Sequence, residues 1–133
     1  MGLKIFQHQL VLSERNRGFH IITRDIINAI PEITSLTTEC WQVFIQHTSA
    51  SLTINENADA TVRKDIENWF NKAIPENENY IHTNEGPDDL PAHIKASLLS
   101  NSVLIPINNG KLTLGLWQGV IYANTVTMVV IDR

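Results

Sequence analysis

The sequence predicts one α+β domain with a largely antiparallel sheet and helices inserted between its strands. Segments rich in β-branched and aromatic residues lie near both ends of the chain, and helical periodicity is confined to the middle. Asn109-Gly110 separates two apolar runs, which is a strong signal for an antiparallel hairpin. The 133 residues, 43% of them hydrophobic, suffice for one core, so residues 1–133 are predicted to form one domain.

The first part of the chain is expected to contain strands and one short helix. Residues 4–12 have a β-like pattern that resumes at 18–23 after the turn residues 14–18. Thr23 is placed to cap a helix that Pro31 ends. Further strands are expected from the β-branched and aromatic residues at 40–47 and the alternation at 51–55.

The clearest helix is predicted over residues 58–73, with Asn57 or Asp59 as its cap. Apolar residues at positions i, i+4, i+7, i+8 and i+11 form one face, which we expect to pack on the sheet: Val62, Ile66, Trp69, Phe70 and Ala73. Trp69 is therefore expected to contribute several kcal/mol, about 3–5, to stability.

The remaining segments complete the predicted fold. A polar loop leads to a second helix near 89–99, whose first turn accommodates Pro91 and whose cap is an Asp. Strands are then predicted at 102–107, 111–123 and 125–132.

Composition excludes several classes of partner. The net charge is −4 and no basic run exceeds Arg63-Lys64, so nucleic acid is not expected to bind. No apolar stretch approaches the roughly 18 residues of a membrane span, and the N-terminus lacks signal-peptide features, which predicts a cytoplasmic protein without a membrane partner. The one cysteine, Cys40, adjoins Trp41 in an apolar run and is expected to be buried and inert.

Residues 46–59, QHTSASLTINENAD, form the first of two polar stretches. On a strand, His47 and Ser49 would share one face, so a serine nucleophile with a histidine base is conceivable. No nucleophile-elbow motif surrounds Ser49, and a pair at i and i+2 on one strand is poorly aligned for proton transfer. These residues are also ordinary constituents of an edge strand.

Residues 82–95, HTNEGPDDLPAHIK, form the second polar stretch. His82 on the loop and His93 on the helix could converge with His47 on one divalent metal, for which zinc suits three imidazoles. Acidic neighbours could orient those rings or act as a general base: Glu85, Asp88 and Asp89. Alternatively, the two aspartates only stabilise the helix N-terminus and His93 is an ordinary helix residue.

Several motifs together resemble the YjbQ family, also called the secondary thiamine-phosphate synthase family. They are RGFH, QHTSASLTINENAD, EGPDDLPAHIK and GKLTLGLWQG, and the match runs from about residue 5 to 122. The resemblance implies an α+β fold with a β-sandwich-like mixed sheet, assembled as a homotrimer. It also implies a cleft that contains His47, Thr48, Ser49, Asn55, Glu56, Asn57, Asp59, Glu85, Asp88, Asp89, His93, Trp117 and Gln118.

Within that cleft the predicted roles fall into three groups. Catalysis is assigned to Ser49, Glu85, Asp88, Asp89 and Gln118. Substrate binding is assigned to Thr48, Asn55, Glu56, Asn57, Lys111 and Trp117. Metal binding is assigned to His47, His82 and His93. The partners expected are a small-molecule ligand and further copies of the chain.

The sequence departs from the family pattern near its C-terminal end. Relatives typically carry an arginine pair after the Trp-Gln-Gly motif, whereas here no such pair occurs between Ala123 and Met128. If those arginines hold a phosphate in relatives, Lys111 and Arg63 are the remaining candidates here. A trimmed hairpin tip would explain the difference equally well.

Three functions therefore remain open. The resemblance implies a weak thiamine phosphate synthase activity. Releasing pyrophosphate needs a metal or cationic groups, however, and the candidate site is acidic. A metal-dependent enzyme acting on another small molecule is the preferred hypothesis. The alternative is a non-catalytic trimeric protein that binds a ligand or an anion.

Overall fold

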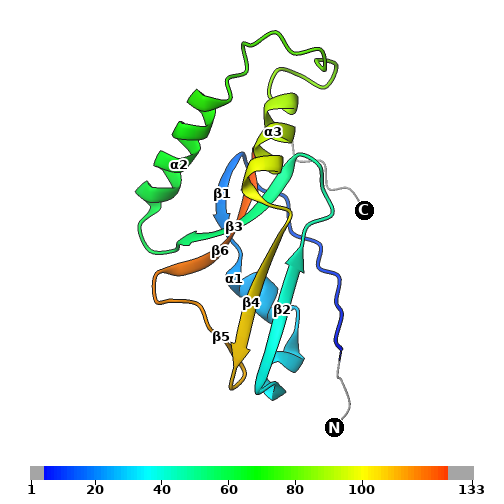
Figure 1. Cartoon of the computed structure of the whole chain (residues 1–133), viewed down its shortest axis with the longest axis vertical. Coiled ribbons are helices and arrows are strands. Elements are labelled where there is room, and N and C mark those ends of the chain that lie inside the picture. Colours follow the sequence, from blue (N-terminus) through cyan, green and yellow to red (C-terminus); the bar gives the residue numbers. More distant parts are fainter. Residues whose placement is uncertain (1–4, 126–133) are drawn as a thin grey trace.

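The computed structural model describes residues 5–125, which form two three-stranded sheets and two helices that cover one of them (Figure 1). Every strand pairing in this part of the chain is antiparallel. The first sheet has the order β1-β6-β3, with β1 Gly18–Ile21, β6 Gln118–Asn124 and β3 Ala50–Glu56. The second has the order β2-β4-β5, with β2 Thr38–Phe44, β4 Ser102–Asn108 and β5 Lys111–Leu112. The predicted α+β class and the largely antiparallel pairing are confirmed.

Helices connect the strands at the positions expected from the sequence. α1 spans Thr23–Asn28 and is followed by the 3₁₀ helix η1, Pro31–Ser35. α2 spans Ala60–Ala73, and the Asp59 carboxylate caps it by accepting a hydrogen bond from the Thr61 amide at 2.9 Å. Hydrogen bonds from the Thr61 hydroxyl and amide lower the pKa of Asp59. α3 spans Asp89–Leu99 and places Pro91 in its first turn.

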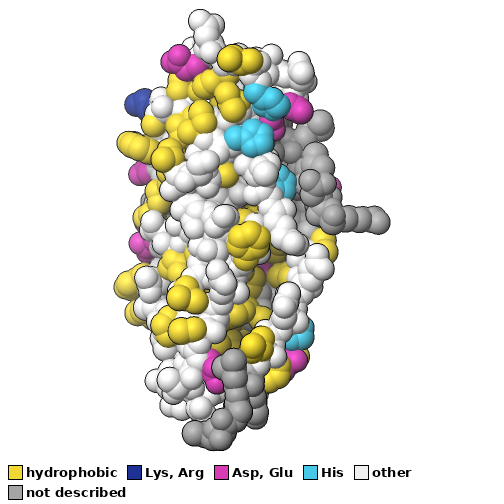
Figure 2. All heavy atoms as spheres, turned by 45° about the vertical axis from the view of Figure 1, so that its right-hand side comes forward, with side chains coloured by type: hydrophobic (Ala, Val, Ile, Leu, Met, Phe, Trp, Pro, Cys, Tyr) yellow, Lys and Arg dark blue, Asp and Glu magenta, His cyan; other side chains and the backbone are white. Residues whose placement is uncertain are grey.

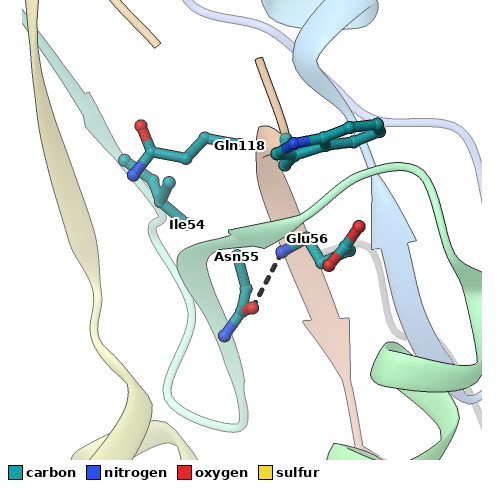
Figure 3. A pocket seen from close by; sticks show the side chains of 5 residues that line it. Ile54, Asn55, Glu56 and Gln118 are labelled. Atoms are coloured by element: carbon teal, nitrogen blue, oxygen red, sulfur yellow. Dashed lines mark hydrogen bonds between the residues drawn. The ribbon is translucent and has the colours of Figure 1, made fainter. Parts of the chain in front are cut away.

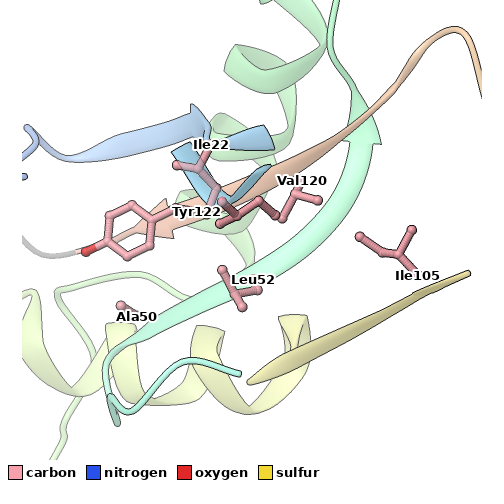
Figure 4. Packing of buried hydrophobic residues seen from close by; sticks show 7 residues of the cluster. Ile22, Ala50, Leu52, Ile105, Val120 and Tyr122 are labelled. Atoms are coloured by element: carbon pink, nitrogen blue, oxygen red, sulfur yellow. The ribbon is translucent and has the colours of Figure 1, made fainter. Parts of the chain in front are cut away.

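One face of the first sheet packs toward the second sheet. The side chains of Leu52, Val120 and Tyr122 meet Ile105 from β4, and Ile22 and Ile26 from the α1 region close the cluster (Figure 4). Alternation along each strand directs these residues to one side. This cluster joins elements from both sheets and is the larger part of the core.

α2 and α3 pack on the opposite face of the first sheet. A smaller cluster of Phe19, Ile121 and Ala123 lies there. Ile66 and Phe70 from α2 and Leu99 from α3 pack against it, and the rings of Phe19 and Phe70 are 6.3 Å apart. α3 contacts β3, and this contact places the start of α3 beside residues 48–50.

The hairpin predicted at Asn109-Gly110 is confirmed. Asn109 and Gly110 have φ values of +50° and +75°, as a two-residue turn with two left-handed positions requires. β4 and β5 pair directly across it, with Asn108 opposite Lys111.

Several predicted elements are wrong or shorter than expected. The described residues of the 4–12 segment form no strand, and β3 begins at Ala50, so His47 and Ser49 precede it. Thr23 is the first residue of α1 and makes no cap; its hydroxyl accepts a hydrogen bond from the Val120 amide instead. The apolar run 111–123 divides into β5 and β6, and most of the strand predicted at 125–132 lies outside the described residues.

Cys40 is exposed, contrary to the prediction. β2 alternates, so Trp41 and Val43 face the core while Cys40 and Phe44 face outward. The inference from an adjacent tryptophan was wrong because neighbours on a strand point to opposite faces.

Trp69 was also wrongly predicted to be a core residue. Its side chain is 62% exposed and contacts the Phe70 ring edge-on at 5.2 Å between centroids. Ile66 and Phe70 supply the packing of α2, and no residue of α2 is fully buried. The apolar face of α2 is wider than the surface of this helix that contacts the sheet.

No helix within residues 5–125 combines the length and the apolar character that crossing a bilayer requires.

Candidate functional site

The start of α3 brings two histidines and a carboxylate together. Asp89 is the first residue of α3, and His93 follows one turn later on the same side. His82 reaches the same point from the preceding loop. Its Nε2 lies 3.0 Å from Asp89 Oδ2, and the Nε2 of His93 lies 3.1 Å from the same oxygen. Figure 2 shows histidine and acidic side chains gathered near the upper end of this face.

These three residues have the composition of a metal site. One potential ligand atom from each of His82, Asp89 and His93 lies within 4.8 Å of the others. The two imidazole rings are 5.7 Å apart between centroids and steeply inclined at 72°. We call His82, Asp89 and His93 the histidine–aspartate trio.

The backbone of Thr48 fixes the orientation of His93. The Nδ1 atom of His93 lies 3.0 Å from the Thr48 carbonyl oxygen. A carbonyl only accepts, so Nδ1 carries the proton and Nε2 is the nitrogen that faces Asp89. This arrangement is common for metal-binding histidines, whose second nitrogen is held by a carbonyl or a carboxylate. Thr48 thus contributes its backbone carbonyl to the position of His93.

Glu85 approaches the trio from the loop. Its Oε2 is 2.8 Å from His82 Nε2, and its side chain is 60% exposed. Glu85 therefore remains accessible to a ligand that binds beside the trio. Its position is consistent with the role predicted from the sequence.

His47 is not part of the trio. Its Nδ1 accepts a hydrogen bond from the Ser49 amide at 3.0 Å, and the Ser49 hydroxyl lies 3.3 Å from the same nitrogen. Ser49 itself is only 7% exposed. Since the amide already uses the Nδ1 lone pair, this contact does not prepare Ser49 as a nucleophile.

A buried polar network holds α3 against α2. The Lys95 side chain is 1% exposed, and its ammonium donates to Asn71 Oδ1 at 2.8 Å. Arg17 donates to the same oxygen at 3.0 Å and to Glu76 at 2.6 Å, and it lies 3.9 Å from Asp88. The network ties α2, α3 and the loop before α3 together.

Burial has a measurable consequence for Lys95. Desolvation, followed by the neighbouring Arg17 charge, lowers the pKa of its ammonium, while the carboxylates of Glu76, Glu67 and Asp88 oppose that shift. Sequence analysis did not identify this network. A lysine on a helix is usually solvated, and nothing in the sequence pattern marks Lys95 as different.

Four of the other predicted site residues, Asn55, Glu56, Trp117 and Gln118, line a separate pocket. A cavity of about 290 Å³ is lined by Ile54, Asn55, Glu56, Trp117 and Gln118 (Figure 3). The Asn55 side-chain oxygen accepts a hydrogen bond from the Glu56 amide at 2.8 Å, at the end of β3. Trp117 is 60% exposed, so its ring is open to a ligand.

Asn57 and Gly119 fix the wall of this Trp117 pocket. The Asn57 amide donates to the Trp117 carbonyl at 2.9 Å, and its side chain donates to the Gln118 carbonyl at 3.0 Å. A Cβ on Gly119 would lie 2.8 Å from the Asn57 Cβ, so only glycine permits this approach.

The two groups of predicted residues lie at opposite ends of β3 in one chain. Thr48 and the trio are near Ala50, whereas the Trp117 pocket is at Glu56. Seven strand residues span roughly 20 Å. Lys111 lies in the β4–β5 hairpin and lines neither group. The predicted set thus occupies two surfaces of one chain.

Comparison with known proteins identifies the family. The family model described as UPF0047 protein YjbQ-like matches residues 8–129. This chain belongs to the YjbQ family. The YjbQ protein of Escherichia coli O157:H7 is 44% identical over 115 residues, which cover 86% of this chain and 83% of that protein. The UPF0047 protein sll1880 of Synechocystis is also 44% identical, over 86% of this chain and 79% of its own.

Solved structures of YjbQ family proteins share the fold. A protein from Clostridium acetobutylicum, described as an uncharacterized conserved protein of the yjbq/upf0047 family, superposes with a TM-score of 0.75. It is 40% identical and covers 87% of this chain and 86% of that one. The conserved hypothetical protein TT1486 of Thermus thermophilus superposes with a TM-score of 0.72 at 31% identity, covering 84% and 83% of the two chains.

Proposed function

We propose that this YjbQ family protein is a metal-dependent enzyme acting on a small molecule, with a divalent cation, zinc, held by the histidine–aspartate trio. The observation that carries the proposal is the approach of two imidazole Nε2 atoms to the same Asp89 oxygen, at 3.0 and 3.1 Å.

The spacing of the trio suits zinc. Zinc binds imidazole nitrogen and carboxylate oxygen at about 2.0–2.2 Å, so tetrahedral ligands lie roughly 3.4 Å apart. Asp89 Oδ2 needs to separate from each of the two imidazole nitrogens by only a few tenths of an ångström to reach that spacing. Two nitrogens and one carboxylate oxygen also form the ligand set of many catalytic zinc sites, which keep a fourth position for substrate or water.

The tautomer of His93 leaves its Nε2 lone pair available to a cation. With its proton on Nδ1, directed to Thr48, a neutral ring presents a lone pair to the Asp89 carboxylate. Two acceptors repel unless a positive charge lies between them. A metal ion satisfies both acceptors and leaves the ring neutral, whereas a second proton makes the ring an imidazolium.

Glu85 is the general base that we propose. Its carboxylate is exposed and adjoins His82. The Glu85 side chain is long enough to reach a ligand bound at the trio. A bound divalent cation would supply Lewis acidity toward an oxygen of the substrate or of water.

Metal analysis of untagged protein tests the proposal. We expect one zinc per chain, and at least a hundredfold weaker zinc binding in calorimetry for His82→Ala, His93→Ala and Asp89→Ala. His8→Ala is the matched control, because His8 also contacts a carboxylate, Glu32 at 3.0 Å, outside the trio. Equal zinc binding by wild type and His93→Ala would refute the site, and a non-catalytic ligand-binding protein would become the better assignment.

His47→Ala measures whether His47 also binds the cation. Unchanged affinity restricts the ligands to the trio, and a loss comparable to that of His93→Ala extends the site to all three histidines of the sequence prediction. The Nδ1 of His47 already accepts a hydrogen bond from the Ser49 amide.

Thiamine phosphate synthase activity is expected to be a side activity at most. The arginine pair is missing from the sequence, and Arg63 donates a hydrogen bond to the Glu56 carbonyl at 3.2 Å, at the Trp117 pocket rather than at the trio. Pyrophosphate release near the trio would depend on the proposed cation alone, without the arginine pair. Robust turnover of the two thiamine precursors in vitro would contradict this expectation.

The proposed assembly is a homotrimer. Its support in the single chain is the outward face of the second sheet, where Phe44 is 58% and Leu104 is 65% exposed. Apolar residues gathered on one sheet face are typical of an interface. Light scattering should give three times the chain mass of 15.0 kDa, and Leu104→Arg should lower it. A mass of one chain for the wild type would refute the trimer.

A further inference from the structure

The loop between α2 and α3 encloses a cavity beside the trio that no step above uses. Its volume is about 250 Å³, and its lining includes Glu76, Glu78, Tyr80, His82 and Thr83. His82 belongs both to this loop cavity and to the trio. A ligand in the loop cavity therefore lies next to the proposed metal.

Hydrogen bonds hold the walls of the loop cavity. The Tyr80 hydroxyl donates to the Pro75 carbonyl at 2.9 Å, and the Tyr80 amide donates to the Glu78 carbonyl at 2.9 Å. Arg17 holds Glu76 through its 2.6 Å contact, which connects the loop to the buried Lys95 network. A site whose walls are already ordered loses less entropy when it binds a ligand.

The charge of the loop cavity is negative. Glu76 is neutralised by Arg17, whereas no hydrogen bond or ion pair of the Glu78 carboxylate occurs among residues 5–125. The lining contains no lysine or arginine. An anion would therefore meet only repulsion from Glu78, while a cation would find a carboxylate without a partner.

The other residues that line the loop cavity indicate the chemistry of the uncharged part of the ligand. Tyr80 offers an aromatic face, which attracts both apolar groups and cations, and Pro87 adds apolar surface. The volume lies just below the 300–1,000 Å³ typical of ligand sites, which indicates a small ligand.

We infer that the loop cavity binds the substrate of the proposed enzyme, and that this substrate is a small organic cation, an amine or amidine with an apolar body. Its charged nitrogen pairs with Glu78, its body lies against Tyr80, and its reacting group extends past His82 to the metal. The inference rests on the proposed function for this last contact only.

The test is a titration of isotope-labelled, metal-free protein followed by NMR, with three probes of similar size: benzylamine, benzyl alcohol and benzoate. We expect benzylamine to bind at least tenfold more tightly than benzyl alcohol and to shift the amides of Tyr80, His82 and Thr83. Benzoate should not bind. Equal binding of the three probes, or shifts confined to the Trp117 pocket, would overturn the inference.

Two variants that each remove one carboxylate show which glutamate binds the amine. Glu78→Gln should abolish the preference for benzylamine over benzyl alcohol, whereas Glu56→Gln, in the Trp117 pocket, should retain it. The reverse result would assign the cation to the Trp117 pocket and refute the loop cavity.

Zinc calorimetry on the same samples separates the two proposals. Zinc binding without amine binding refutes the loop cavity alone, and amine binding without zinc binding refutes the metal site alone.

Discussion

α2 and α3 cover the same face of one sheet, yet they are held there in different ways. α2 has the clearer apolar periodicity in the sequence, but none of its residues is fully buried and Trp69 is exposed. α3 has a weaker apolar pattern, yet Pro91, Ala92 and Lys95 are buried. The comparison shows that the depth of burial depends on where a helix lies over the sheet, and only secondarily on its own apolar stripe.

This difference matters for function because α3 carries Asp89 and His93. A metal site needs ligands held to within fractions of an ångström by surrounding contacts. The buried side of α3, including Lys95 and its bond to Asn71, supplies such contacts, while the opposite side presents Asp89 and His93, the proposed ligands. Among the described residues, α2 contributes nothing to a candidate metal-binding group. Looser packing of α2 therefore does not disturb the position of such ligands.

The largest effect is expected from Lys95→Ala. The change removes a fully buried aliphatic stem and the bond to Asn71, and should lower the free energy of unfolding by about 3 kcal/mol, within the range for large-to-small core changes. Lys95→Met is the matched control. It fills the same volume without a buried charge, and should cost little or even stabilise. Chemical denaturation measures both, and equal losses would show that the charge rather than the packing anchors α3.

Phe70→Ala should have the next largest effect. Phe70 is half-buried against Phe19, so the loss should be about 2 kcal/mol, below the 3–5 kcal/mol of a fully buried phenylalanine. Denaturant titration at pH 7 measures it. If Phe70→Ala lowers the free energy of unfolding more than Lys95→Ala does, α2 rather than α3 is the more firmly packed helix.

Trp69→Ala should cost about 1 kcal/mol or less. Its exposed ring contributes mainly the edge-on contact with Phe70, and such aromatic pairs are worth about 0.5–1.5 kcal/mol. The melting temperature measured beside that of Phe70→Ala is a direct comparison. A loss above 3 kcal/mol would mean that another subunit covers Trp69 in the assembly.

The smallest expected effect is a pH dependence. The pKa of Lys95 is lowered in the folded protein from its ordinary value of 10.5. Below the folded pKa both states hold the proton and the desolvation penalty is complete; as the pH rises from there toward 10.5, the folded state releases its proton first and the penalty is relieved. Wild type should therefore gain stability relative to Lys95→Met as the pH rises through that window. A constant difference between the two proteins across that window would refute the shift.

Much of the candidate site was predictable from residue chemistry. His82 and His93 were predicted as metal ligands because imidazoles bind metals, and because a loop followed by a helix can bring them together, whereas Asp89 was predicted to orient the rings or act as a base. The third member of the trio was not predictable. Asp89 rather than His47 completes the trio, because it shares the first turns of α3 with His93, whereas the Nδ1 of His47 is bonded to the Ser49 amide.

By itself the sequence determined the elements that local rules govern: the α+β class, the start of α2 with Asn57 or Asp59 as its cap, and the hairpin turn at Asn109-Gly110. The tertiary structure decided which side chains those elements bury. Cys40 and Trp69 were assigned from sequence patterns and Lys95 was not singled out, and each lies where the packing of sheets and helices placed it. Turn and cap preferences act over a few residues of backbone, whereas burial depends on surfaces contributed by segments distant in the chain, and no short pattern encodes those.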